Sequence, residues 1–151
     1  MEKKKAGLKE GATKKFEWTK IEEALEETDK ELIGEGSFGE TYQGYLGSDK
    51  AVAIKVLGDA QLAADRASKD DKSGEQKWRQ VFDNEIKILS DASHRNVVKL
   101  IGYAVCEDKE SKDHGRLALV FELLENGTLA ELVKSKGFTA EKRLRALVDA
   151  A

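Results

Sequence analysis

The sequence predicts an α+β fold in which a five-stranded antiparallel sheet is accompanied by one main helix. Short runs between residues 31 and 123 are rich in β-branched and aromatic side chains, as strands usually are. One longer run, residues 77–92, instead has apolar side chains at spacings of three and four, which indicates an amphipathic helix. A charged turn, "DKESKDHG", joins the last two strand-like runs and favours an antiparallel pair.

Two segments precede the first predicted strand. Residues 1–15, "MEKKKAGLKEGATKK", are basic and have no apolar core, so we expect a flexible, solvated tail. Weak contact of its lysines with an anionic membrane surface is the alternative. Residues 16–30 lead into the sheet as a short extended piece followed by an acidic helix, which the helical spacing of Ile21, Ala24 and Leu25 predicts.

The strands are predicted in chain order. "ELIGEG" and "GETYQGYL" flank a glycine loop at residues 36–39, and "AVAIKVL" at residues 51–57 has the composition of a strand. Alternate side chains of a strand share a face, so Ala53 and Lys55 lie on one face and the β-branched residues on the other. "NVVKLIGYAVCE" and "RLALVFELL" predict the last two strands.

The other predicted elements are one long loop and three helices. Glu85 is the one acid on the mostly apolar face of the helix at residues 77–92, and the polar stretch 58–77 before it predicts a long loop. "NGTLAELVKSKG" predicts a helix that begins near Thr128 and stops at Gly137. "TAEKRLRALVDAA" predicts a further helix.

The stretch "GEGSFGETYQG" carries the spacing G-x-G-x-x-G, which occurs in several kinds of nucleotide site. A dinucleotide site needs a helix after the third glycine, and a Walker loop needs G-K-S/T; here a strand, a turn and another strand follow instead. A hairpin loop that covers phosphates remains, and it requires a lysine on the next strand. Lys55 satisfies that requirement, and Glu85 is the candidate counter-charge.

Motifs in a fixed order carry a family resemblance. "GEGSFGET", "VAIK", "FDNEIKIL", "HRNVVKLIGY" and "LVFELLENGTL" resemble the small lobe of eukaryotic protein kinases. The closest resemblance is to plant receptor-like and receptor-like cytoplasmic Ser/Thr kinases, over residues 16–151. It implies a small lobe at residues 31–123, then the hinge and first helices of a truncated large lobe at residues 124–151.

The resemblance also implies an ATP site and its residues. Lys55 would contact the α- and β-phosphates and pair with Glu85, as the two catalytic residues of this part. Backbone groups of Glu122 and Leu124 would hydrogen-bond the adenine edge, and Thr41 stands where the family usually has valine. The implied nucleotide-binding residues are Ile33, Gly34, Glu35, Gly36, Ser37, Phe38, Gly39, Thr41, Ala53, Lys55, Phe121, Glu122 and Leu124.

Neither the H-R-D-x-x-x-x-N motif nor the D-F-G motif of the family occurs in the sequence, so no metal ligands are assigned. The resemblance therefore implies the ATP-binding part of a Ser/Thr protein kinase, inactive by itself, whose Mg²⁺ ligands lie elsewhere in the complete enzyme. A catalytically dead nucleotide-binding or regulatory module is the alternative. In either case we expect a protein partner or substrate in signalling.

Composition excludes other classes. The net charge of −3 argues against a nucleic-acid binder, which is usually basic. No apolar run approaches the ~18–20 residues that span a membrane. A single cysteine, Cys106, permits no intrachain disulfide and favours a reducing compartment, so we expect a cytoplasmic protein.

Overall fold

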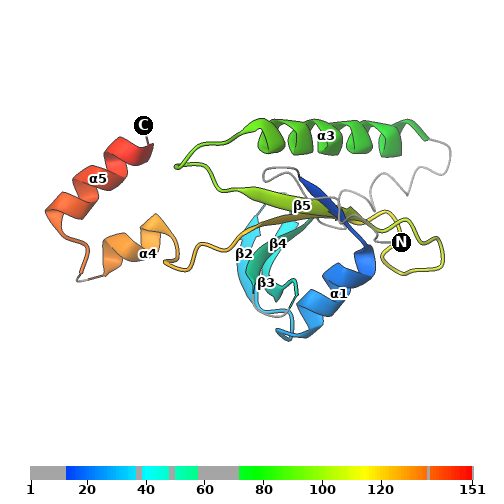
Figure 1. The fold of residues 1–151 in the computed structure, drawn as a ribbon, viewed down its shortest axis with the longest axis horizontal. Helices are drawn as coiled ribbons and strands as arrows, with labels where there is room; N and C mark the ends of the chain where they lie inside the picture. Colours follow the sequence, from blue (N-terminus) through cyan, green and yellow to red (C-terminus); the bar gives the residue numbers. More distant parts are fainter. Residues whose placement is uncertain (1–12, 37–38, 48–49, 58–71, 136, 151) are drawn as a thin grey trace, which may run out of the picture.

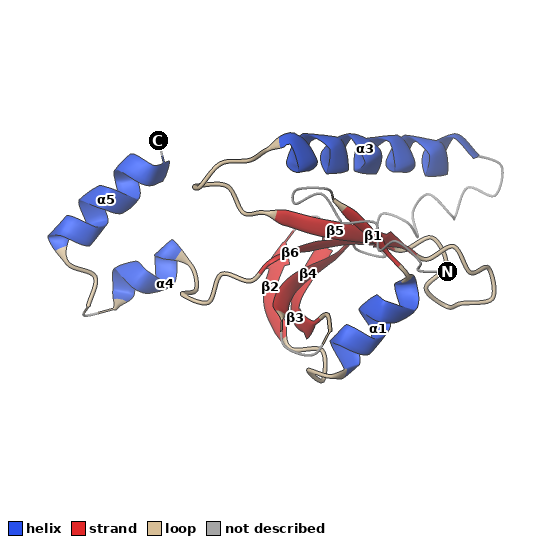
Figure 2. Cartoon of the chain, in the orientation of Figure 1, coloured by secondary structure: helices blue, strands red, loops and turns tan. Residues whose placement is uncertain are grey.

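A computed structural model describes residues 13–36, 39–47, 50–57, 72–135 and 137–150. Its centre is one six-stranded mixed sheet with the order β1-β5-β6-β4-β3-β2 (Figures 1 and 2). The strands are β1 (Lys14–Phe16), β2 (Leu32–Gly36), β3 (Gly39–Tyr45), β4 (Ala51–Leu57), β5 (Leu100–Val105) and β6 (Leu117–Glu122). The helices are α1 (Trp18–Glu26), α3 (Lys72–Asp91), α4 (Leu129–Lys134) and α5 (Ala140–Ala150).

The structure confirms the α+β class but corrects the predicted five-stranded antiparallel sheet. The additional strand is β1, which pairs with β5 in parallel, with Lys14 opposite Gly102 and Phe16 opposite Ala104. Its sequence, "KKF", has no alternation that would predict a strand, and Lys14 and Lys15 belong to the predicted tail. The strand forms because Gly102 has no side chain and lets β1 approach. A Cβ there would lie 2.2 Å from the Lys14 carbonyl oxygen.

The sheet has two covered faces. On one face α1 packs through Ile21, Ala24 and Leu25 against alternate residues of β4 and β6, which form one buried cluster. Helix α3 lies on the opposite face, where Phe82 is buried with Leu119 of β6 and other apolar side chains (Figure 1). The predicted alternation on β4 is confirmed: its three β-branched residues are buried in the α1 cluster.

Two helix boundaries differ from the predictions. Helix α3 begins at Lys72, so the end of the predicted loop at residues 58–77 is helical, whereas residues 58–71 lie outside the described part. The predicted start of α4 is confirmed, because Thr128 and Glu131 form a capping box there. Helix α4 ends at Lys134 rather than at Gly137, since Ser135 already has an extended backbone.

Helices α4 and α5 lie beyond the end of β6, away from the sheet (Figure 1). No residue of either helix is buried within the described part of the chain. The end of α5 contacts the turn after α3, where Asn96 Nδ2 donates to the Asp149 carbonyl oxygen at 2.9 Å. Arg95 and the Asp149 carboxylate lie 3.5 Å apart in the same contact. None of the described helices is long and apolar enough to cross a membrane.

We predict that Gly102→Ala destabilises the fold by about 1–3 kcal/mol, because the added methyl group overpacks the contact with β1. Its Cβ would lie 2.2 Å from the Lys14 carbonyl oxygen and 2.4 Å from the Phe16 ring. Gly36→Ala is the matched control, since a Cβ there meets nothing within 4 Å. Urea unfolding followed by circular dichroism compares the two, and equal midpoints would contradict the tight pairing of β1 with β5.

Candidate functional site

Lys55 lies on an interior strand, on the face of the sheet that α3 covers. Its cross-strand neighbours are Thr41 on β3 and Leu119 on β6. Directly opposed residues of antiparallel strands share a face, and Leu119 is buried in the same cluster as Phe82 of α3. The lysine side chain therefore leaves the sheet on the side of α3, opposite the apolar cluster under α1.

Glu85 lies on the sheet-facing side of α3. It follows Phe82 by three residues and precedes Leu89 by four, and both of these pack in the α3 cluster. The Glu85 side chain is half-buried. The predicted ion pair between Lys55 and Glu85 stays a prediction.

The glycine loop is a β-hairpin, as predicted, formed by β2 and β3. Gly34 lies opposite Thr41, and Gly36 lies opposite Gly39 at the hairpin end. A helix does not follow the third glycine; β3 begins there instead. Gly39 has a φ of 132°, a backbone conformation that residues other than glycine rarely adopt.

The other predicted loop residues fall into two groups. Ser37 and Phe38, the predicted tip, lie outside the described residues. Glu35 lies opposite Glu40 in the hairpin, and Ile33 is 42 % exposed. Gly34 thus lies opposite Thr41, which in turn lies opposite Lys55, whereas Gly36 and Gly39 lie at the hairpin end, where Gly39 is opposite Leu57.

The predicted adenine residues lie at the end of β6. Phe121 lies directly opposite Ala53 of β4 and packs against the α3 cluster. Leu124, just beyond the strand, is 64 % exposed. The predicted contacts of these residues with adenine stay predictions, but the strands bring Ala53, Lys55 and Phe121 to one face.

The side chain of Glu122 has a role that the sequence did not indicate. Its carboxylate accepts a hydrogen bond from the Lys99 backbone N–H at 2.8 Å, and the Glu122 N–H donates to the Lys99 carbonyl at 3.0 Å. These two bonds fix the last residue of β6 against the start of β5. Only a known strand register could have predicted them, because the two residues lie 23 positions apart.

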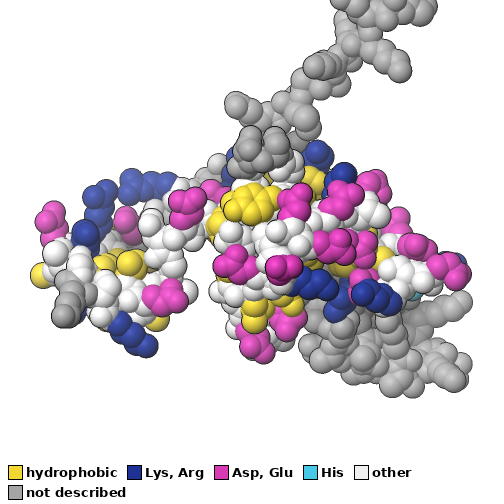
Figure 3. Space-filling model, turned by 90° about the horizontal axis from the view of Figure 1, so that it is seen from below, with side chains coloured by type: hydrophobic (Ala, Val, Ile, Leu, Met, Phe, Trp, Pro, Cys, Tyr) yellow, Lys and Arg dark blue, Asp and Glu magenta, His cyan; other side chains and the backbone are white. Residues whose placement is uncertain are grey.

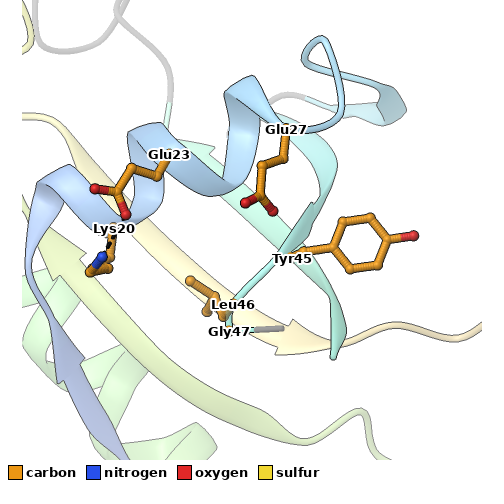
Figure 4. Close-up of a pocket in the computed structure, with 6 residues that line it drawn as sticks. All are labelled: Lys20, Glu23, Glu27, Tyr45, Leu46 and Gly47. Atoms are coloured by element: carbon orange, nitrogen blue, oxygen red, sulfur yellow. Dashed lines mark hydrogen bonds and ion pairs between the residues drawn. The ribbon is translucent and has the colours of Figure 1, made fainter. Parts of the chain in front are cut away.

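Three hollows that described residues line all border α1 rather than the glycine loop. The hollow in Figure 4, of about 610 Å³, lies between α1 and the end of β3. Its rim holds an exposed ion pair of 2.6 Å between Lys20 and Glu23, with Glu27 beside it. Figure 3 shows further acidic side chains scattered over this side of the molecule. Binding pockets for small molecules are mainly apolar, so this charged hollow carries no ligand assignment.

Metal ligands do not gather in the described part of the chain, where no three His, Cys, Asp or Glu side chains form a possible metal site.

The hydrogen bond of 2.6 Å from Tyr42 Oη to the Glu40 carboxylate raises the pKa of Tyr42 above its ordinary value of 10.0. Tyr42 faces α1, so this bond lies on the opposite side of the sheet from Lys55.

Comparison with known proteins gives related sequences and similar folds. Residues 28–150 match the model of the protein kinase domain. Leaf rust 10 disease-resistance locus receptor-like protein kinase-like 1.4 of Arabidopsis thaliana is 40 % identical over 116 residues, which are 77 % of this chain and 14 % of that protein. A probable leucine-rich repeat receptor-like protein kinase of the same plant is 32 % identical over 141 residues, which are 91 % of this chain and 14 % of that protein. The chain thus spans about a seventh of these relatives.

Solved structures share the fold. An apo pseudokinase is 27 % identical with a TM-score of 0.61, over 91 % of this chain and 44 % of that one. The pseudokinase domain of BIR2, described as an immune regulator of the RLK/Pelle family, is 24 % identical with a TM-score of 0.59. That match covers 86 % of this chain and 36 % of the BIR2 chain.

We predict that Glu40→Gln lowers the pKa of Tyr42, because the mutation removes the charged acceptor of the Tyr42 hydroxyl. A raised folded-state pKa means that the stabilisation is complete below pH 10.0 and is lost as the pH rises through the folded-state pKa. Tyrosinate absorbance during an alkaline titration measures the effect, with Tyr42→Phe to identify the signal. A Tyr42 titration that Glu40→Gln leaves unchanged would refute the hydrogen bond.

Proposed function

The chain belongs to the protein kinase family, and we propose that it carries the ATP-binding part of a Ser/Thr protein kinase. One observation carries the proposal: Lys55 leaves an interior strand on the side of α3, directly beside Thr41 of the glycine hairpin. A loop lid, a lysine next to it and a helix that bears an acid are the parts that hold the phosphates of ATP in this family.

Each part has a separate task in the proposed site. Backbone amides at Gly34 and Gly36 approach the phosphates closely because no side chain stands in the way, and the Lys55 ammonium offsets their negative charge. Glu85 holds the ammonium in place as its counter-charge. Ala53 is small enough to leave room for a flat base against β4, with Phe121 beside it at the back of the pocket.

Phosphoryl transfer needs groups in addition to these. In the family, Mg²⁺ neutralises charge on the phosphates when bound, and an aspartate accepts the proton of the substrate hydroxyl. The described residues contain no metal-ligand cluster, and the sequence has neither the D-F-G nor the H-R-D motif. The residues of this chain therefore bind and orient ATP, and we assign no transfer step to them.

A second candidate function is a catalytically dead nucleotide-binding or regulatory module. The observation that favours it is the similarity to an apo pseudokinase at 27 % identity over 91 % of the chain. Nucleotide binding is common to both candidates, so the ATP site is the first property to test. In both, the proposed setting is cytoplasmic signalling with a protein partner, since the relatives are named receptor-like kinases.

We predict that Lys55→Met weakens ATP binding by about tenfold or more, because a charge-assisted contact with the phosphates is lost. Lys50→Met is the matched control: it removes the same charge at the exposed start of β4, outside the proposed site. Calorimetric titration with ATP and Mg²⁺ measures both affinities. Equal loss in the two variants would show that net charge alone matters, and the site assignment would then be wrong.

We also predict that the 151-residue chain transfers no phosphoryl group by itself, since positioning and electrostatic stabilisation supply nearly all catalysis in this reaction. The measurement is incubation with labelled ATP, Mg²⁺ or Mn²⁺ and a generic Ser/Thr protein substrate. Label transfer that disappears in Lys55→Met would contradict the prediction, whereas transfer that persists in Lys55→Met indicates a contaminating enzyme.

A further inference from the structure

One side-chain hydrogen bond ties the segment before β1 to the last turn of α3. The Thr13 hydroxyl donates to the Ser90 hydroxyl, although the two residues are 77 positions apart. Thr13 directly precedes β1, and Ser90 is the last residue but one of α3. Both side chains are half-buried, so water competes less for this bond than for one on the open surface.

The Thr13 end of this bond is held firmly. Strand β1 follows at once and pairs with β5, and its backbone approaches β5 closely at Gly102. Lys15 also forms an ion pair of 2.9 Å with Glu107, just after β5. Residues 13–16 therefore form a short strap that is fixed to the edge of the sheet.

Ser90, at the other end of this hydrogen bond, belongs to α3, and the contacts that the described residues of α3 make with the sheet are apolar. Phe82 is buried and meets the Tyr103 ring of β5 edge-on, with ring centres 6.0 Å apart. Ile86 and Leu89 are partly buried against the same cluster. These apolar contacts decide which side of α3 faces the sheet, but the hydrophobic effect itself has no direction, so they leave room for small rotations of the helix about its axis. A hydrogen bond does have a preferred direction.

The rotation of α3 decides where Glu85 points. Glu85 precedes Ser90 by five residues, about 7.5 Å along a helix, and a continuous helix turns as one body. We propose that Thr13 and Ser90 are positioning residues: their hydrogen bond fixes the fine rotation of α3 and thereby the direction in which Glu85 points on the side of the sheet where Lys55 lies. The effect on nucleotide affinity rests on the proposed function, whereas the effect on α3 does not.

Variants that change one hydroxyl at a time test the proposal. Thr13→Val keeps the shape of the side chain and removes the hydroxyl, Ser90→Ala removes the acceptor, and Thr13→Ser keeps a donor as the matched control. We expect the first two to weaken ATP binding about threefold to tenfold and Thr13→Ser to stay within about twofold. The double variant Thr13→Val/Ser90→Ala is expected to be no weaker than either single variant, because both remove the same bond.

Hydrogen exchange along α3 is the second measurement and does not depend on ATP. We expect faster exchange near the end of α3 in Thr13→Val and in Ser90→Ala, but not in Thr13→Ser. If the unaltered chain binds no ATP while exchange responds in this way, the proposed function fails and the positioning role stands. Unchanged exchange overturns the positioning role. A Thr13→Val variant that binds ATP as tightly as the unaltered chain, and only unfolds more easily, also overturns the positioning role. Ser90→Ala introduces a strong helix former, so it keeps the test valid if Thr13→Val does not fold.

Discussion

The alternation of side chains along β4 governs how the rest of the molecule is arranged. Val52, Ile54 and Val56 point to one face and are buried under α1, so that face is apolar. Ala53 and Lys55 point to the other face, beside the glycine hairpin and under α3. A shift of one residue in the register of β4 would place the lysine in the apolar cluster under α1 and move the β-branched residues to the α3 face, which few sequences tolerate.

This division explains why the two helices meet different demands. Helix α1 approaches the sheet so closely that a Cβ on Gly44 of β3 would lie 3.0 Å from the Ala24 carbonyl oxygen, and its role is to exclude water. Among the described side chains of α3, Phe82, Ile86 and Leu89 pack on the sheet, and the helix presents the half-buried Glu85. An acid can serve a half-buried lysine only if its direction is controlled, and a directional hydrogen bond adds to the control that apolar packing gives.

Local patterns predicted most elements, and long-range contacts account for those they missed. The β-branched run at 51–57 and the Thr128 cap were sufficient because each acts over a few residues. Strand β1 was missed because "KKF" becomes a strand only against Gly102, far away in the sequence. The bonds of Glu122 with Lys99 and of Thr13 with Ser90 were missed for the same reason. The faces on which the two proposed site residues lie, that of Lys55 on β4 and that of Glu85 on α3, followed from strand alternation and helical spacing, whereas their mutual contact stays a prediction that depends on how α3 is docked.

Binding and transfer place different requirements on such a site. Recognition of phosphates needs a close backbone and a fixed cation, which the β2–β3 hairpin and β4 would supply in the proposed site through regular strand geometry. Transfer also needs an aligned acceptor and metal ligands, and the sequence motifs for these do not occur in this chain. Both candidate functions therefore need the same residues to bind the nucleotide, and they differ only in whether phosphoryl transfer follows. In the proposed site, a change that loosens α3 would impair both, because Glu85 would act while ATP is being held and before any bond is broken.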